Sequence, residues 1–397
     1  MAPKPALLAA AALNVVLLFT MAAVLALPVM APAIAADTGL PASALGVYSF
    51  LMWTAAILAS FVAGDLIARL GAVRVSQGSL ALCAIALAVG ASGFTPALAV
   101  TPLLIGIACA VETPSSSEIL ARVTPPARRT FIFSLKQTGV QIGGMLAGIA
   151  YPAALPALGW RGTMLTLAGL VAAWALALEP MRRRLDSRRA APRPHGGETS
   201  GLAYVWRTPA LRDLATASFA FHAMQVCLNT FLVAYLVGEH GLSLAAAGLL
   251  LTIAQLGGFV GRLGFGFVVG SRLGVLRLLI AIGFGMTAAA LAIGLATGYL
   301  STAWLGVLCF VFGLTSSGWN GVFLAEVVRE SPPGEIARVT GGVMVTAYAG
   351  LILGPVAFSA AAAAAATLAA GYVLLAGATL TGTLSLLRAR HDPPRAV

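Results

Sequence analysis

The chain has 397 residues, of which 59% are hydrophobic and only 9% are charged, and its mean hydropathy is +0.95. Soluble domains carry roughly 25% charged residues, so this chain cannot cover a water-exposed surface and is expected to cross a membrane many times. The net charge of +11 does not indicate nucleic-acid binding, because the basic residues are spread along short connections rather than clustered on one face.

The first apolar segment, residues 7–35, follows Lys4 and ends in small residues that imitate the cleavage site of a secretory signal. The apolar region of a signal is about 7–15 residues long, and this segment is about twice that length. We therefore expect a retained membrane-spanning helix, with a cleaved signal as the alternative.

A membrane-spanning helix needs about 20 apolar residues, and twelve segments meet this requirement. They are residues 7–35, 43–63, 76–94, 97–120, 131–154, 162–178, 213–237, 244–268, 275–297, 301–325, 340–362 and 364–387. The last two share one apolar stretch that is too long for a single crossing and suits a tight hairpin. The sequence predicts an all-α membrane protein with 12 transmembrane helices.

The basic residues lie almost entirely in alternate connections. With the N-terminus inside, the inner connections hold 21 of the 24 Lys and Arg residues and the outer ones hold only Arg161, while Lys136 and Arg262 lie within spans. Because positive residues favour the cytoplasmic side, both termini are predicted to be cytoplasmic. The Ala- and Arg-rich composition is typical of a bacterial chain, so the expected location is the inner membrane.

The only long connection, residues 180–212, is rich in Arg, Pro, Gly and Ser, which predicts a flexible cytoplasmic linker. It separates an N-terminal six-helix bundle, residues 1–179, from a C-terminal one, residues 213–397. RLGAVR at 69–74 returns as RLGVLR at 272–277, and RVTPP at 122–126 returns as RESPP at 329–333. The offsets of 203 and 207 residues indicate two pseudo-symmetric repeats, as in transporters that rock around a substrate.

This organisation resembles the major facilitator superfamily over the whole chain. Residues 64–74 look like the family's loop 2–3 signature, G-x-L-x-D-R-x-G-x-R/K, which implies a loop that changes with conformation. Its candidate residues are Gly64, Asp65, Arg69, Gly71 and Arg74, with Arg272 and Gly274 in the second copy. The signature's acid, which in the family helps to latch one conformation, is replaced by Ala68, and Asp65 is the only acid nearby in the sequence.

Residues 134–140, 261–266 and 318–326 are similar to segments of bacterial carriers that distantly resemble small-anion porters of the cyanate and nitrate types. Drug/proton antiporters carry an Arg four residues before a Gly in span four. Before Gly106 that position holds Pro102, and the antiporters' Gly-Pro signature is absent from span five. The resemblance implies an anion carrier more than a drug exporter.

Lys136 is the most informative candidate, because burying an ammonium in an apolar helix costs a few kcal/mol or more. One hypothesis is an anchor for an anionic substrate. The others are a structural ion pair with Glu118 of span four, which substrate could displace, and a lysine that snorkels to the interface. Arg262 in span eight suits bidentate carboxylate binding, or it caps backbone carbonyls near the helix end.

Span four carries two acids in the segment 112–118. Glu112, nearest the midplane, is predicted to carry a proton, with a protonated structural acid as the alternative. Glu118 is the second proton-coupling candidate, although its i, i+4 spacing to Arg122 also suits a helix-end ion pair.

The remaining substrate-binding candidates are polar residues in apolar spans. His222, Gln225 and Asn229 have i, i+3, i+7 spacing and share one helix face, which predicts either a cavity lining or hydrogen bonds between helices. Trp319 and Asn320 in span ten offer a ring and an amide to a substrate. Asn14 in span one and Gln137 and Gln141 in span five are weaker candidates.

Glycine pairs spaced by four, including Gly139/Gly143 and Gly257/Gly261, predict close helix packing. They lie inside apolar runs and so do not form phosphate loops. The sequence holds no metal-ligand cluster, cofactor motif or nucleophile–base pair, so we expect no enzyme, metal or cofactor.

These observations predict a secondary transporter that moves a small organic anion, a carboxylate, by alternating access. Proton-coupled symport is the favoured mechanism, and the partners are the anion, protons and the lipid bilayer, with the protein acting as a monomer. Efflux of a drug or metabolite by proton antiport, an uncoupled uniporter or exchanger, and a transporter-like sensor remain alternatives.

Overall fold

The computed structural model describes residues 4–125, 129–186, 198–269, 274–332 and 335–389. The described residues are almost entirely helical and contain no β-strand. In chain order the helices are α1 (Lys4–Thr38), α2 (Ala44–Leu70), α3 (Ala72–Ala91), α4 (Thr95–Val123), α5 (Arg129–Ala177), α6 (Glu179–Leu185), α7 (Glu198–Arg207), α8 (Pro209–Gly238), α9 (Leu244–Val269), α10 (Val275–Ala296), the short 3-10 helix η2 (Thr297–Tyr299), α11 (Thr302–Gly318), α12 (Asn320–Glu330), α13 (Ile336–Ala365) and α14 (Ala369–Ala389).

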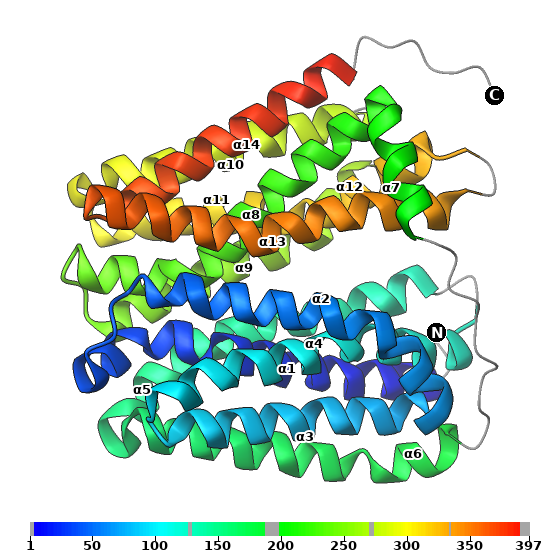
Figure 1. Ribbon diagram of the computed structural model, residues 1–397, viewed down its shortest axis with the longest axis horizontal. Coiled ribbons are helices and arrows are strands. Elements are labelled where there is room, and N and C mark those ends of the chain that lie inside the picture. The colour runs from blue at the N-terminus through cyan, green and yellow to red at the C-terminus, as the bar shows by residue number, and fades with distance from the viewer. Residues whose placement is uncertain (1–3, 126–128, 187–197, 270–273, 333–334, 390–397) are drawn as a thin grey trace. The chain divides into compact units, whose positions relative to one another are not determined.

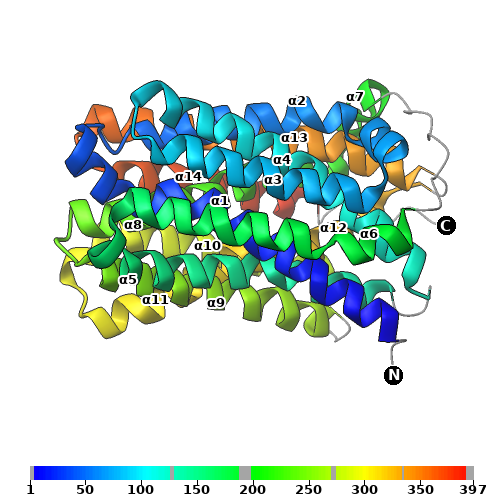
Figure 2. The same ribbon diagram turned by 90° about the horizontal axis from the view of Figure 1, so that it is seen from below.

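The helices group into two compact units. Unit 1 comprises Met1–Ala42 and Tyr48–Pro194, and unit 2 comprises Ser43–Val47 and His195–Val397. Within each unit the long helices run along one another in two perpendicular views (Figures 1 and 2). Each unit therefore buries its own set of apolar helix faces.

Eleven helices of the described chain are long and apolar enough to cross a membrane. One of them contains two of the predicted spans, because α5 has 49 residues and would be about 74 Å long if straight, more than twice the hydrocarbon core of about 30 Å. Gly159 interrupts it with a φ of 63°, a conformation that glycine adopts without strain. The two spans expected at 131–154 and 162–178 thus meet at a glycine turn.

The predicted C-terminal hairpin is confirmed. The helices α13 and α14 are separated by three residues, and Ala366 at the end of α13 has a left-handed conformation with φ 55°. A left-handed residue is a common way to end a helix, and it lets the chain reverse directly after the alanine run.

The segment predicted as a linker, residues 180–212, includes helices near both of its ends. The first residues of this segment belong to α6 and its last ones to α7 and to the start of α8, while residues 187–197 lie outside the described part of the chain. In unit 1, α6 lies beside α3, and in unit 2, α7 packs on α13 (Figure 1).

Glycines let two pairs of helices approach closely in unit 1. A Cβ atom on Gly139 or Gly143 of α5 would lie 2.3 Å from the Asn14 carbonyl oxygen or 2.4 Å from that of Leu18, both on α1. A Cβ on Gly106 of α4 would lie 2.1 Å from the Met52 carbonyl oxygen of α2. Such distances admit no side chain, so these positions require glycine.

Unit 2 repeats both contacts. Gly350 of α13 faces the Phe219 carbonyl of α8 with a would-be Cβ distance of 2.1 Å, and Gly313 of α11 faces the Ala254 carbonyl of α9 at 1.7 Å. Gly106 and Gly313 are 207 residues apart, the offset already found between RVTPP and RESPP, and Gly139 and Gly350 are 211 apart. The predicted close packing by Gly257 and Gly261 is also confirmed, since they face α11.

Gly313→Ala tests this packing, because the new methyl group would overlap the Ala254 carbonyl. Overpacking of this kind costs about 1–3 kcal/mol and should lower the thermal unfolding midpoint of purified protein by several degrees. Gly169→Ala is the matched control, since nothing lies within 4 Å of its would-be Cβ. A Gly313→Ala protein as stable as Gly169→Ala would contradict the role assigned to the close contact.

Candidate functional site

Lys136 forms a buried ion pair with Glu112, which brings α5 and α4 together inside unit 1. Its Nζ lies 3.3 Å from Oε1 of Glu112 and donates a hydrogen bond of 3.4 Å to Oε2. The two side chains are only 3% and 1% exposed. Lys136 therefore does not snorkel, and its partner is an acid of span four, as one hypothesis held.

The acid expected in that hypothesis was wrong, because Glu118 does not contact Lys136. Glu118 accepts a hydrogen bond of 3.1 Å from Nε of Arg122, and both side chains are about a quarter exposed. Glu118 lies six positions after Glu112, which turns its side chain by about 240° around the helix. Glu112 therefore faces α5, and the i, i+4 ion pair explains Glu118.

Asn14 of α1 holds the turn of α5 that carries Lys136. Its amide nitrogen lies 2.9 Å from the Leu135 carbonyl oxygen, 3.2 Å from that of Lys136 and 2.9 Å from the Thr138 hydroxyl. Sequence reasoning gave Asn14 little weight, although one amide in a long apolar span requires hydrogen-bond partners. Gln137 is half-buried and follows Lys136 directly, so it points about 100° away from the ion pair.

The predicted polar stripe of α8 is the accessible side of a buried helix. Between Ala220 and Leu236, every residue is buried except His222, Gln225 and Asn229, which are partly exposed. The i, i+3, i+7 spacing therefore does place these three side chains together, on the face of α8 that other apolar side chains do not cover.

The stripe also makes the interhelical hydrogen bonds of the alternative hypothesis. Gln225 accepts a bond of 3.3 Å from the Asn320 amide, and Asn229 accepts one of 3.1 Å from the Gln255 amide of α9. His222 Nδ1 lies 2.9 Å from the Ser218 carbonyl oxygen of its own helix. Gln255, buried and absent from the predictions, is the added member of this network.

The polar candidates of span ten lie at a local irregularity of the helical chain. The helix α11 ends at Gly318 and α12 begins at Asn320, but Trp319 between them keeps helical backbone angles, with φ −72° and ψ −22°. Side chains bond the carbonyl oxygens just before this residue: Trp319 Nε1 donates to Ser316 at 3.1 Å, and Arg262 Nε donates to Ser317 at 3.1 Å. Residues 302–330 together form one candidate membrane span, in agreement with the single span predicted at 301–325.

The side chains of Arg262 and Trp319, both predicted to bind substrate, contact other groups of the protein in this structure. Arg262 caps a carbonyl, as its alternative hypothesis held, and within the described residues it has no carboxylate partner. The Trp319 ring is fully buried and meets the His222 ring edge-on, with centroids 4.7 Å apart. In this conformation the ring and its N–H are already occupied.

The two repeats differ at the ion pair. The 207-residue offset that relates Gly106 to Gly313 relates Glu112 to Trp319, and the 211-residue offset of Gly139 and Gly350 relates Lys136 to Ala347. The carboxylate of one repeat is therefore an indole in the other, and the ammonium is a methyl group. The ion pair is a property of unit 1 alone.

The predicted conformational loop joins α2 to α3. Gly64, Asp65 and Arg69 are exposed at the end of α2, whereas Gly71 is buried, and Arg74 reaches Gln77 through a long hydrogen bond of 3.5 Å. In the second copy, Gly274 precedes α10, and Arg272 lies outside the described residues.

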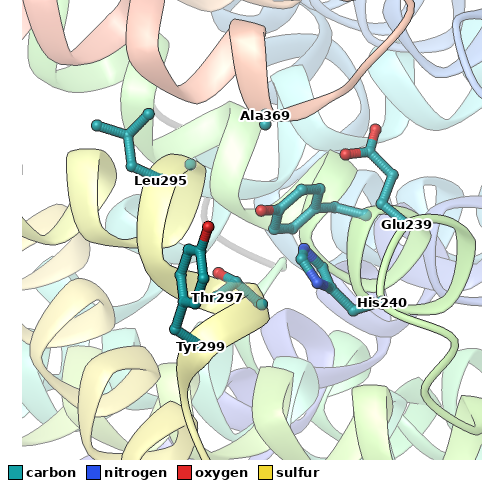
Figure 3. A pocket seen from close by; sticks show the side chains of 9 residues that line it. Glu239, His240, Leu295, Thr297, Tyr299 and Ala369 are labelled. Carbon is teal, nitrogen blue, oxygen red and sulfur yellow. The ribbon is translucent and has the colours of Figure 1, made fainter.

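A separate cavity of about 430 Å³ opens at the far end of α8 in unit 2 (Figure 3). Tyr235, Glu239, His240, Thr297 and Tyr299 are among its lining residues. The Glu239 carboxylate is engaged by the Thr367 hydroxyl and the Leu368 amide. None of the predicted site residues lines this cavity, so it is not the predicted substrate site.

No group of three or more His, Cys, Asp or Glu side chains able to hold a metal occurs among the residues that the structure describes. The chemistry available to the sites described above is that of fixed charges, amides, imidazole and a titratable carboxylate.

The chain belongs to the major facilitator superfamily, whose sequence profile matches residues 12–355. A gallate transporter from Pseudomonas putida is 26% identical over 277 residues, which cover 61% of this chain and 61% of the relative. A hexuronate transporter from Bacillus subtilis (strain 168) is 25% identical over 257 residues, 61% of this chain and 59% of the relative. The chain thus spans about three-fifths of these relatives, and they point to a transporter and not an enzyme.

Solved structures agree on the fold. The nucleoside transporter NupG matches with a TM-score of 0.74 at 13% identity, covering 97% of this chain and 100% of that one. A POT family transporter in complex with 5-aminolevulinic acid matches with a TM-score of 0.77 at 14% identity, covering 96% and 95%. The predicted fold class, a 12-helix membrane protein of this superfamily, is confirmed.

Removing one partner of the buried ion pair should be far more harmful than removing both. Glu112→Gln or Lys136→Gln alone leaves an uncompensated buried charge, which costs about 3–5 kcal/mol. The double variant Glu112→Gln/Lys136→Gln should recover most of this loss, as measured by thermal unfolding of the purified proteins. Additive losses in the double variant would show that the two groups are not coupled.

Proposed function

We propose that the protein is a secondary transporter that moves a small organic anion, a carboxylate, across a bacterial plasma membrane by alternating access and proton-coupled symport. It acts as a monomer with both termini in the cytoplasm. The observation that carries this proposal is the buried ion pair of Lys136 and Glu112. The basic connections of the sequence support the orientation.

The ion pair provides a physical basis for coupling. A lysine buried in this way needs a negative partner, and losing it costs about 3–5 kcal/mol. Protonation of Glu112 removes its charge, so an incoming carboxylate can take its place on Lys136 at a much smaller cost. Because Lys136 holds one carboxylate at a time, each bound anion requires one proton on Glu112, and the buried region stays neutral in both states.

Glu118 is proposed to pass protons between Glu112 and water. It lies six residues nearer the end of α4 and is partly exposed, whereas Glu112 is buried. Its contact with Arg122 keeps a carboxylate at the accessible end of the helix. This path needs no titratable group other than the two acids of span four.

The polar groups of unit 2 are proposed to orient the substrate. They are His222, Gln225 and Asn229 on α8, Trp319 and Asn320 in span ten, and Arg262, with Gln137 in unit 1 as a further contact. The amide pairs Gln225–Asn320 and Asn229–Gln255 can exchange their mutual hydrogen bonds for bonds to substrate hydroxyls.

The names of the relatives support this substrate class. Gallate and hexuronates share one carboxylate on a small six-membered ring that bears several hydroxyl groups, although one ring is aromatic and the other is a sugar. An ammonium for the carboxylate and amides for the hydroxyls are the groups that such molecules require. Export of a drug or metabolite by proton antiport is the second candidate, and the direction of the driving gradient separates the two.

Transport in liposomes tests the proposal with labelled gallate and glucuronate as probes. Purified protein should accumulate one of these anions when the interior is alkaline, because inward proton flow drives symport. Lys136→Ala should reduce uptake to the level of empty liposomes. Glu112→Gln should abolish the effect of the pH gradient but retain exchange of labelled for unlabelled anion, because a neutral side chain permanently mimics the protonated acid.

Lys4→Ala is the matched control, since Lys4 is the only other lysine in the chain, and it should transport at the wild-type rate. Accumulation driven by an acidic interior would favour antiport. Wild-type uptake by Lys136→Ala would exclude the anchoring role of Lys136.

A further inference from the structure

The N-terminal end of α3 is capped by a carboxylate from the start of the linker. Asp186, directly after α6, accepts a hydrogen bond of 3.0 Å from the Val73 amide through Oδ1 and one of 2.9 Å from the Arg74 amide through Oδ2. These amides are the second and third of the helix, which have no partner within it. Asp186 therefore does what an N-cap side chain usually does, although it lies 113 and 112 residues away in the sequence from the two amides.

Gly71 makes room for this contact. It has a φ of 96°, and a Cβ atom on it would lie 2.5 Å from Cγ of Asp186 and 2.9 Å from its Cβ. A side chain at this position would strain the backbone conformation and would occupy the space of the Asp186 carboxylate, so it fits only where that carboxylate is removed as well. The glycine of the loop signature is thus explained by the docked Asp186.

A second set of bonds fixes the rest of α6. Gln77 of α3 donates to the Ala175 carbonyl oxygen at 3.0 Å and to Glu179 at 3.3 Å, and Arg182 holds the same Glu179 carboxylate at 2.5 and 2.7 Å. Residues 179–186 are therefore attached to α3 at both ends of a short helix.

Asp65, the only acid near the loop in the sequence, does not make such a contact. Its side chain is exposed and has no hydrogen bond or ion pair within the described part of the chain. The signature position itself is Ala68. Among the described residues near this loop, the carboxylate that holds it comes from the linker.

We propose that Asp186 is the acidic latch of the loop between α2 and α3, and that its contact with the end of α3 opens and closes in each transport cycle. The linker joins the two units, and at its other end Gly201 of α7 packs on the Arg338 carbonyl of α13 in unit 2. The contact of Asp186 and α6 with α3 therefore fixes the unit 1 end of this connection, and its release frees residues 179–186 from α3.

This inference rests on the proposed transport activity, and a reversible cross-link tests it. Gly71→Cys/Asp186→Cys places two thiols where the would-be Cβ of Gly71 and the Cβ of Asp186 are 2.9 Å apart, within a small shift of disulfide geometry. The oxidised protein, with the linked peptides identified by mass spectrometry, should lose gallate or glucuronate uptake, and reduction should restore it. Undiminished uptake by the fully cross-linked protein would overturn the proposal.

Each single cysteine variant under the same oxidation controls for the native cysteines. If wild-type protein takes up neither gallate nor glucuronate, that result counts against the proposed function and not against the latch.

Amide hydrogen exchange gives a readout that does not depend on knowing the substrate. In Asp186→Ala, which removes both acceptor oxygens, the Val73 and Arg74 amides should exchange about fivefold to tenfold faster, from the typical contribution of a helix N-cap. Asp65→Ala is the matched control, because it removes the same side chain close by in the sequence, and it should leave exchange unchanged. Equal acceleration in both variants, or none in Asp186→Ala, would refute the assigned contact.

Discussion

The buried ammonium of Lys136 in unit 1 requires a negative partner, and α1, α4 and α5 meet around it. Lys136 meets Glu112 because α4 turns that acid toward α5, while Asn14 of α1 ties down the carbonyls beside the lysine. The glycines of α5 allow α1 to approach closely enough for the Asn14 amide to reach them. The charge, the amide and the close packing are thus one structural unit, and a titratable carboxylate lies at its centre.

The repeated architecture is conserved in packing but not in chemistry. Both units use glycines at corresponding positions to bring the same helix pairs together. At the position of Glu112, however, unit 2 has the buried indole of Trp319, and its cation, Arg262, lies on the second helix of the repeat instead of the fifth. Backbone contacts constrain both repeats equally, whereas side chains near the middle of each unit are free to diverge. Unit 1 therefore carries a titratable pair, and unit 2 carries an amide and imidazole stripe.

Several of the few carboxylates in this chain form their contacts at the ends of helices. Asp186 caps α3, Glu118 pairs with Arg122, and Glu239 holds the turn before α14. Each of these carboxylates neutralises a cation or a positive helix end, where it is worth more than at an open surface. The linker, through Asp186, takes part in this pattern and is not merely a connection.

The sequence alone determined the class of protein, the number and approximate bounds of its spans, the internal repeat and the importance of Lys136. Each of these depends on properties that act locally or over one helix: apolar length, charge placement, and the cost of a charge in an apolar segment. Only the tertiary structure decided that Lys136 faces Glu112 and not Glu118, that Arg262 bonds the Ser317 carbonyl, and that Asp186 caps α3. Those choices depend on helix rotation and on contacts between residues up to 113 positions apart, which no local pattern encodes.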